Sequence, residues 1–237
     1  MIESVNNERI KEYAKLSEKK HRDTSKLFLV EGHHLVSEAL KKNIVKEIFL
    51  LEGETNWYKE VTYVTENVLK KLSDLKTPAK VIAVCHRVLS DKLIGNVLLL
   101  DDIADPGNLG TIIRTAAAFN YETIILSPGS VDAYNSKVIR ATEGMLFNVN
   151  LIVADLESVI NRLKKDDYLI LASSPKASNI ASKVRGRHGL IIGSEARGIK
   201  TEISRLADQI LRIPMSDNCE SLNAGVAAGI LMYELNK

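Results

Sequence analysis

Three segments, far apart in the chain, place polar side chains beside glycines at the ends of apolar runs. The segments are 105–119, 190–201 and 213–235. Their polar side chains are Asn108, Arg114, Glu195, Ser221 and Asn223. Amide, hydroxyl, carboxylate and guanidinium groups bind and orient phosphates and sugars. Ligands of α/β proteins lie beyond the carboxyl ends of strands, so these segments are candidates for one site.

Each of these side chains also has an ordinary structural interpretation. Arg114 suits an exposed helix position, and Glu195 suits a helix N-terminus, whose dipole favours a carboxylate. Asn108 and Ser221 are each suited to cap the helix that follows. The polar residues therefore support a site only when the segments are considered together.

Nucleotide-binding loops are the first alternative for these segments. Segment 190–201 resembles the phosphate-binding G-x-x-x-x-G-K-[ST] loop, but Ile199 separates Gly198 from Lys200. Glu195 would also repel a phosphate there. The segment 101–110 lacks the G-x-G-x-x-G spacing of a dinucleotide site. A nucleotide hydrolase remains a weak hypothesis, which predicts magnesium-dependent turnover that Lys200→Ala abolishes.

Apolar runs alternate with helical patterns along the chain, which predicts an α/β fold. In the first part we expect strands at 27–30, 45–51, 61–64 and 81–85, and helices at 33–41 and 65–72. Later runs are continuously apolar, as in a parallel sheet buried on both faces. There we expect strands at 97–100, 123–126, 168–172, 190–192 and 209–213, and helices at 109–119, 135–142, 156–164 and 222–235. Polar residues 87–95 suggest domains at 1–92 and 96–237.

The composition is that of a globular protein, with 45% hydrophobic residues and a net charge of +2 over 237 residues. Cys85 and Cys219 form no C-x-x-C pair, which argues against a zinc site or a disulfide framework. No metal is predicted. The chain has no signal-like apolar core and no apolar run near the roughly 20 residues that cross a bilayer. We therefore expect a soluble, cytoplasmic protein with no membrane partner.

Taken together, the three segments resemble the SpoU (TrmH-like) family of RNA ribose 2′-O-methyltransferases. The family pattern N-x-G-x-x-x-R-[ST] matches 108–115, G-x-E-x-x-G matches 193–198, and I-P-M followed by S-L-N matches 213–215 and 221–223. Ala224-Gly225 stands where the family usually has Val-Ser. Residues 21–32 are similar to the N-terminal substrate-binding domain often fused to these enzymes. The resemblance thus implies a small α/β RNA-binding domain followed by an α/β methyltransferase domain with a deep trefoil knot.

The resemblance also implies a cofactor and a set of site residues. The cofactor is S-adenosylmethionine, bound largely through backbone groups near Gly193, Ile213, Met215 and Leu222. Arg114 matches the family's catalytic residue, and Asn108, Glu195, Ser221 and Asn223 would orient Arg114 and the ribose. Because a guanidinium stays protonated in nearly all proteins, a phosphate clamp is easier to defend than a base. A Glu195–Arg114 ion pair would explain the carboxylate in that loop.

Basic residues gather in 9–26, where seven Lys or Arg stand against three acidic residues. A basic helix suits RNA phosphates, although a solvated helix face is an equal alternative. The candidate RNA-binding residues are Lys19, Lys20, Arg22, Lys26, Lys137 and Arg140. Aromatic residues make up only 5%, which argues against a base-stacking platform.

These observations leave several functions open. Ribosomal RNA of the large subunit is the expected substrate, with transfer RNA as the near alternative. A non-catalytic RNA-binding assembly factor of the same fold is the rival to an enzyme. The family also implies a homodimer, for which the small-residue helix 222–235 is a candidate contact, although a monomer core would use that helix equally well.

Overall fold

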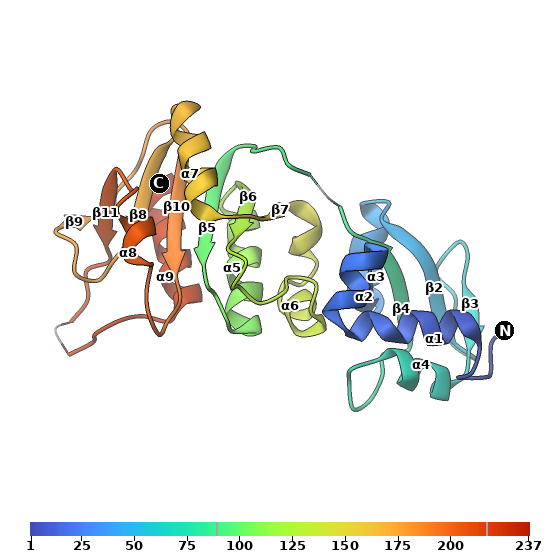
Figure 1. Cartoon of the computed structure of the whole chain (residues 1–237). Helices are drawn as coiled ribbons and strands as arrows, with labels where there is room; N and C mark the ends of the chain where they lie inside the picture. Colours follow the sequence, from blue (N-terminus) through green and yellow to red (C-terminus); the bar gives the residue numbers. More distant parts are fainter. Residues whose placement is uncertain (89, 217) are drawn as a thin grey trace. The chain divides into compact units, whose positions relative to one another are not determined.

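The computed structural model describes residues 1–88, 90–216 and 218–237. Contacts divide the chain into two compact units. The first unit contains residues 1–88 and 132–147, and the second contains residues 89–131 and 148–237. Both units combine helices with a sheet, which confirms the predicted α/β class (Figure 1).

The first unit is built on a mixed sheet with the order β1-β4-β2-β3. Its strands are β1 (Leu27–Glu31), β2 (Val45–Leu51), β3 (Thr62–Val64) and β4 (Val81–His86). Its helices are α1 (Glu8–Ala14), η1 (Lys15–Ser17), α2 (Lys19–Ser25), α3 (His33–Lys41), α4 (Glu66–Leu72), α6 (Ser136–Ala141) and η2 (Met145–Asn148, whose last residue falls in the second unit). β4 pairs antiparallel with both β1 and β2, while β2 and β3 run parallel. A core of apolar side chains from α1, α4 and the strands includes Ile10, Tyr13, Phe49 and Leu69.

Residues 132–147 pack with the first unit although they follow the first strands of the second. The Tyr134 ring lies 4.9 Å from that of Phe28. The buried Arg22 guanidinium donates to Asp132 at 2.7 Å. The predicted limits, 1–92 and 96–237, differ from the observed division in this segment because these contacts join residues over a hundred positions apart.

The second unit is a parallel sheet with the order β7-β6-β5-β10-β8-β11-β9 (Figure 1). Its strands are β5 (Asn96–Asp101), β6 (Tyr121–Leu126), β7 (Asn150–Val153), β8 (Leu169–Ser173), β9 (Asn179–Ile180), β10 (His188–Gly193) and β11 (Gln209–Arg212). Its helices are α5 (Pro106–Ala118), α7 (Leu156–Lys165), α8 (Thr201–Ser204) and α9 (Ala224–Asn236). The paired strands run parallel, as the unbroken apolar runs predict.

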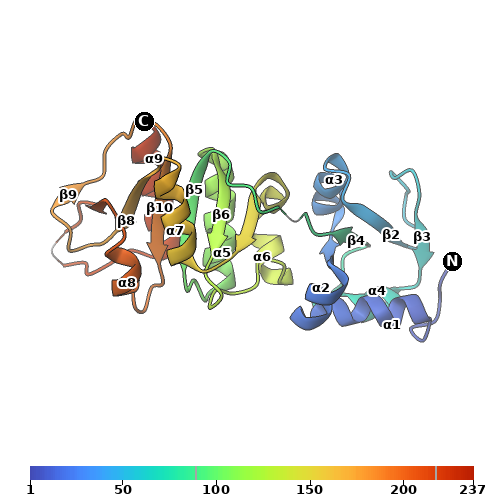
Figure 2. The ribbon, with the colours of Figure 1, turned by 45° about the horizontal axis from the view of Figure 1, so that its top comes forward.

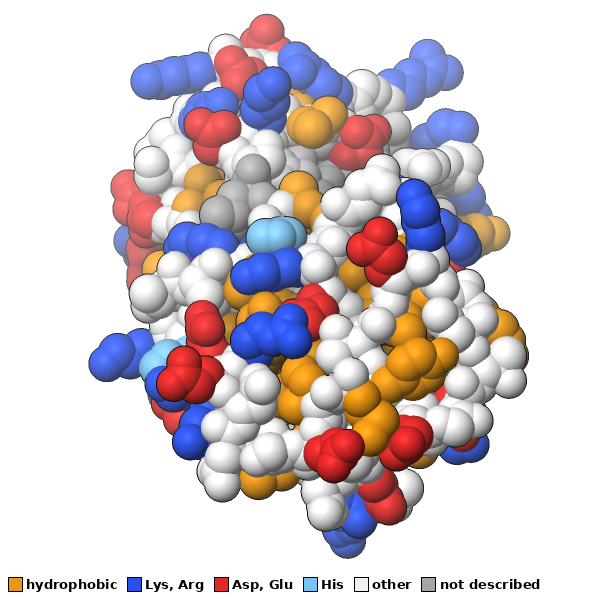
Figure 3. All heavy atoms as spheres, turned by 90° about the vertical axis from the view of Figure 1, so that its right-hand side faces the viewer, with side chains coloured by type: hydrophobic (Ala, Val, Ile, Leu, Met, Phe, Trp, Pro, Cys, Tyr) orange, Lys and Arg blue, Asp and Glu red, His pale blue; other side chains and the backbone are white. Residues whose placement is uncertain are grey.

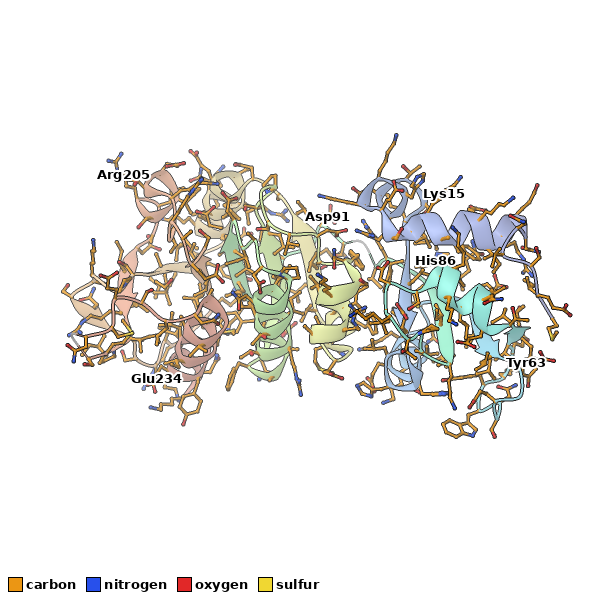
Figure 4. All side chains as sticks on the ribbon, turned by 90° about the horizontal axis from the view of Figure 1, so that it is seen from below. Lys15, Tyr63, His86, Asp91, Arg205 and Glu234 are labelled. Atoms are coloured by element: carbon orange, nitrogen blue, oxygen red, sulfur yellow. The ribbon has the colours of Figure 1, made fainter. Side chains whose placement is uncertain are left out.

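Helices cover both faces of this parallel sheet. One face packs against α7 and α8 through Ile160, Leu163 and Ile203. α5 and α9 cover the opposite face. Arg205, which follows α8, and Glu234 of α9 accordingly lie on opposite sides of the sheet in Figure 4. The unit therefore has the helix–sheet–helix layering expected of a parallel sheet.

The small residues of α9 allow a close approach to α5. A Cβ added at Gly225 would lie 3.2 Å from the Thr111 methyl group, and one added at Gly229 would lie 3.5 Å from that of Thr115. The small residues of α9 are therefore explained by its close packing against α5 within the unit.

In the second unit, three short elements were not expected from the sequence: β7, β9 and α8. β7 is an edge strand whose Val153 is 62% exposed, and β9 and α8 are too short to show a periodic pattern. Within the described residues, no helix combines the length and apolarity needed to cross a membrane.

Candidate active site

The three predicted segments follow β5, β10 and β11, which are parallel strands of the second unit. β5 and β10 are adjacent, and Gly193 at the end of β10 lies opposite Asp101 at the end of β5. β8 and then β11 follow on the other side of β10. From β5 the chain moves outward to β6 and β7, and it then crosses to β8 on the far side of β10. The loops therefore gather at a topological switch point, where ligands of such sheets bind.

The first segment forms the start of α5. Asp105, and not Asn108, is the N-cap residue: its side chain accepts a hydrogen bond from the Asn108 backbone N–H at 2.8 Å. Pro106 occupies the first turn, where its missing N–H costs nothing. The predicted capping role of Asn108 is therefore wrong, and its side chain is available for other contacts.

Both glycines of the second segment are required by the backbone. A Cβ at Gly193 would overlap the carbonyl group of Gly198 and the nitrogen of Ile199, because the loop folds back over Gly193. A bridge between Ser194 and Gly198 closes this loop. Gly198 has φ +66°, a conformation that glycine adopts without strain. The tight loop presents Glu195 toward the start of α5.

A chain of hydrogen bonds joins the three segments. Asn223 donates from Nδ2 to the Asn108 side-chain oxygen at 2.9 Å. Asn108 in turn donates from its own Nδ2 to Glu195 Oε1. The Asn223 side-chain oxygen meanwhile accepts from the backbone N–H groups of Gly225 and Val226, so Asn223, and not Ser221, caps α9. The helix cap thus fixes the amide that orients Asn108.

Lys200 fastens the second segment to the end of β5. Its Nζ lies 2.6 Å from Asp102 Oδ2 and 3.2 Å from Asp101 Oδ1, and its backbone N–H donates to Asp101 Oδ2 at 2.8 Å. Asp101 is almost fully buried. The hydrogen bond with Asp102 raises the pKa of Lys200, and the same bond lowers the pKa of Asp102. These residues were not predicted as a group, although Lys200 stands two residues after the glycine motif.

A cavity of about 360 Å³ opens among the loops after β8, β10 and β11. Its apolar wall includes Ile192, Leu211, Ile213, Leu222 and Leu231. Its polar wall includes Ser173, Ser174, Lys176, Ser194, Glu195, Arg197 and Ser221. The loop after β8 was missed in the sequence, where Ser173-Ser-Pro-Lys176 is a plain turn signal at a strand end.

The structure brings most of the predicted site residues to this cavity. Those that line it are Gly193, Glu195, Ile213, Met215, Ser221 and Leu222. Asn108 and Asn223 join the site through the hydrogen-bond chain. Arg114 is exposed on α5, and among the described ion pairs none links it to Glu195. The expected Glu195–Arg114 pair is replaced by the bond from Asn108.

The predicted RNA-binding residues, which all belong to the first unit, differ in accessibility. Lys19, Lys20, Lys26 and Lys137 are exposed. Arg140 is partly buried. Arg22 is only 4% exposed and is bound to Asp132 and to the carbonyl groups of Leu16 and Ser17. Arg22 is therefore removed from the candidates, because a buried and paired guanidinium cannot reach a phosphate.

Comparison with known proteins agrees with this arrangement. The SpoU rRNA Methylase family model matches residues 95–233, and the MRM3-like substrate binding domain model matches residues 7–83. A relative from Bacillus subtilis, the 23S rRNA (guanosine(2553)-2′-O)-methyltransferase RlmP, is 35% identical and covers 99% of this chain and 98% of its own.

Solved structures show the same fold over the whole chain. A crystal structure of an RNA 2′-O ribose methyltransferase has a TM-score of 0.82 and 32% identity, covering 98% of this chain and 96% of its own. An AdoMet-bound rRNA methyltransferase from Sinorhizobium meliloti has a TM-score of 0.82 and 28% identity, covering 98% and 95%. The chain therefore belongs to the SpoU rRNA methylase family of RNA 2′-O-methyltransferases and carries an MRM3-like substrate-binding domain ahead of its catalytic part.

Proposed function

We propose that this protein transfers a methyl group from S-adenosylmethionine to a ribose 2′-hydroxyl of large-subunit ribosomal RNA. The observation that carries the proposal is the hydrogen-bond chain from Asn223 through Asn108 to Glu195 beside the cavity. The 23S rRNA substrate of the Bacillus subtilis relative supports ribosomal RNA. Such a substrate makes a cytoplasmic location part of the proposal.

The cavity suits S-adenosylmethionine in chemistry and in size. Its volume of about 360 Å³ lies in the range of small-molecule sites, roughly 300–1,000 Å³. Ile213 and Leu222 supply apolar contacts for an adenine ring. Within the described residues, the backbone N–H groups of Met215 and Leu222 donate to no other residue, which leaves them available for the ring. Gly193, Ile213, Met215 and Leu222 are therefore the proposed cofactor-binding residues.

The chain's own residues would bind and orient the RNA. Bound S-adenosylmethionine supplies an activated methyl group on a sulfonium. Arg114, exposed on α5, would hold the target phosphate and stabilise negative charge that develops on the ribose oxygen. Asn108 is fixed at both ends of its amide, so it can present a constant hydrogen-bonding edge to the ribose. Ser221 adds a hydroxyl at the same cavity.

The proposal includes a trefoil knot in the residues after β10. β11 inserts in the sheet between β8 and β9, and the chain then returns to place α9 against α5. We expect the same path if the C-terminal segment threads through the preceding loop. Residues 1–92 would bind the RNA and residues 96–237 would carry the knot and the reaction.

We also propose a homodimer that uses α9. Val226 and Tyr233 expose 50% and 51% of their surface on this helix, and the ring of Phe119, the residue after α5, lies 6.0 Å from that of Tyr233. A second copy covering these apolar side chains would remove them from water. Light scattering at the mass of two chains would support the dimer, and a monomer mass at micromolar concentration would reject it.

The function is tested by methyl transfer to RNA. The purified chain is incubated with radiolabelled S-adenosylmethionine and separately with 23S rRNA and bulk transfer RNA, and modified positions are mapped as 2′-O-methyl sites. We expect labelled ribose in 23S rRNA. Label in transfer RNA alone would make transfer RNA the substrate. RNA binding with neither label nor affinity for the cofactor would favour a non-catalytic assembly factor.

A further inference from the structure

An exposed tryptophan lies beside two other rings in the first unit. Trp57, the chain's single tryptophan, leaves 73% of its surface exposed. It belongs to the connection between β2 and β3, which projects from the sheet on the side of α3 (Figure 2). An indole so open to water is unusual for a ring with this much apolar surface, and it calls for a partner.

We propose that Trp57, with His33 and Tyr58, forms a stacking site for one unpaired base of the RNA substrate. The proposal rests on the proposed function for its ligand and adds a contact that the catalytic unit does not supply. We refer to these residues as the ring cluster. Nothing in the catalytic chemistry requires these rings, so the two proposals can be tested separately.

The ring cluster is held in a fixed arrangement. The His33 and Trp57 ring centroids lie 5.0 Å apart at an interplanar angle of 45°. The His33 and Tyr58 rings are nearly parallel, at 6°, and His33 Nδ1 is hydrogen-bonded to the Tyr58 hydroxyl at 2.7 Å. His33 is the first residue of α3, after Gly32 with φ +95°. A ring anchored to a helix therefore supports the loop that carries Trp57.

A groove lined by Asn56 and Lys59, which flank Trp57 and Tyr58 in the chain, carries lysines that suit a nucleic-acid backbone. An open groove of about 850 Å³ is lined by residues that include Lys46, Asn56 and Lys59. Of the two acidic residues that line the groove, Glu47 binds Arg9 at 2.8 Å, whereas Glu60 forms no ion pair with another described residue, so the two lysines outnumber the one unpaired carboxylate. Lys46 and Lys59 form no ion pair with another described residue. Exposed lysines next to an open ring are the combination that binds single-stranded RNA.

Charge alone would bind RNA weakly and without a fixed position on this part of the protein. In the face shown in Figure 3, Lys and Arg side chains are interspersed with Asp and Glu. A stacked base would add a fixed contact, because every base has an aromatic face. The low aromatic content argues against such a platform, yet the fold collects three rings from two segments into one cluster. At this one place the proposal departs from the expectation based on composition, and the titration below decides between them.

The single tryptophan makes a direct measurement possible. Full-length protein is titrated at one salt concentration with single-stranded deca-adenylate and with its duplex with deca-uridylate, while tryptophan fluorescence is followed. We expect saturable quenching by the single strand and little by the duplex, whose paired bases cannot turn out onto the indole. Anisotropy of a labelled deca-adenylate then gives affinities. Trp57→Ala should weaken binding by about tenfold and Trp57→Phe by less, since stacking contributes about 1–3 kcal/mol per base.

Two further variants separate the ring cluster from general damage. Tyr58→Phe removes the hydroxyl that holds His33 and should weaken binding while keeping all rings in the fold. Val153→Ala removes another exposed apolar side chain, from the second unit, and should leave affinity unchanged. Wild-type affinity in Trp57→Ala, or equal quenching by duplex, would overturn the stacking site. If the stacking site were overturned in this way, methyl transfer by Trp57→Ala would show that the proposed function still holds. Absence of methyl transfer by the wild-type protein would reject the proposed function itself.

Discussion

At the scale of single residues, the site depends on Asn223, whose side-chain oxygen and nitrogen make different contacts. The Asn223 oxygen caps α9 and its Nδ2 holds Asn108. An aspartate could accept the same helix N–H groups, but it has no proton to donate to Asn108. A side-chain amide meets both requirements at once, which gives a physical reason for asparagine at this position.

Arg114 allows the sharpest residue-level prediction. It is exposed and lies outside the residues that line the cavity, so Arg114→Ala should leave S-adenosylmethionine affinity unchanged. Methyl transfer should fall by about 10²–10³-fold, the usual cost of losing one group that stabilises developing negative charge. Calorimetry with the cofactor and single-turnover transfer assays measure the two quantities.

Arg114→Lys is the matched control for charge. Lysine keeps the positive charge but lacks the planar fork that binds two phosphate oxygens. Partial activity in this variant would support a phosphate clamp. Equal loss of cofactor affinity and transfer in Arg114→Ala would instead assign the residue to folding or to cofactor binding.

At the scale of elements, the contact of Lys200 with β5 sets the position of the Gly193–Gly198 loop. Lys200→Met removes both side-chain ion pairs and leaves the buried Asp101 oxygen without its cation. Leaving a buried polar group unsatisfied costs about 1–3 kcal/mol. We expect a loss of unfolding free energy in this range, together with a raised KM for S-adenosylmethionine, because the loop lines the cofactor cavity.

Lys164→Met is the matched control in the same unit. Lys164 is paired with Asp208 at 2.7 Å, and both side chains are 36% exposed. Exposed pairs contribute roughly 0–1 kcal/mol, so this variant should change neither stability nor KM appreciably. Lys200→Arg should restore most of both properties. Urea unfolding measures the free energy of unfolding, and initial-rate kinetics measure the KM for S-adenosylmethionine. Equal changes of both quantities in Lys200→Met and Lys164→Met would refute the special role of Lys200.

The sequence predicted strands correctly where apolar runs were long, and it misplaced the start of a helix where more than one residue could act as the cap. The buried strands β5, β6, β8 and β10 follow continuous apolar runs, which only a sheet covered on both faces tolerates. The start of α5 was placed too late, since Asp105-Pro106 is the true cap and first turn. Asn108 resembled a cap because asparagine suits both caps and sites, and sequence alone does not separate these uses.

At the scale of the whole molecule, long-range packing decides what local patterns leave open. Residues 132–147 pack with the first unit through Tyr134 and Asp132, and the burial of Arg22 follows from this packing. From the sequence, Arg22 is expected to be a surface charge because it stands in a basic stretch. Its burial depends on the carboxylate of Asp132, which comes from a distant part of the chain. The ring cluster was missed for the same reason, since His33 and Trp57 meet only in the fold.

The stability of the second unit should depend on pH through one buried histidine. His188 is 1% exposed, and its Nε2 is hydrogen-bonded to the Tyr121 hydroxyl at 2.6 Å. Burial lowers the pKa of His188 below the ordinary value of 6.5. Above pH 6.5 the residue is neutral in both states, so its contribution to stability is complete there. Below pH 6.5 the unfolded chain takes up a proton that the folded chain resists, so unfolding becomes easier as pH falls toward the folded-state pKa.

The expected slope can be measured against a non-titrating variant. One differential proton corresponds to at most about 1.4 kcal/mol per pH unit. His188→Gln should be less stable at neutral pH but should lose less further stability between pH 6.5 and 5 than the wild type does. Because the single tryptophan, Trp57, lies in the first unit, urea unfolding is followed by circular dichroism, which registers the helices and strands of both units. His86→Gln, at an exposed position on β4, should keep the wild-type slope. If His188→Gln kept that slope as well, the acid sensitivity would have to arise from the carboxylates, whose protonation on unfolding has the same sign.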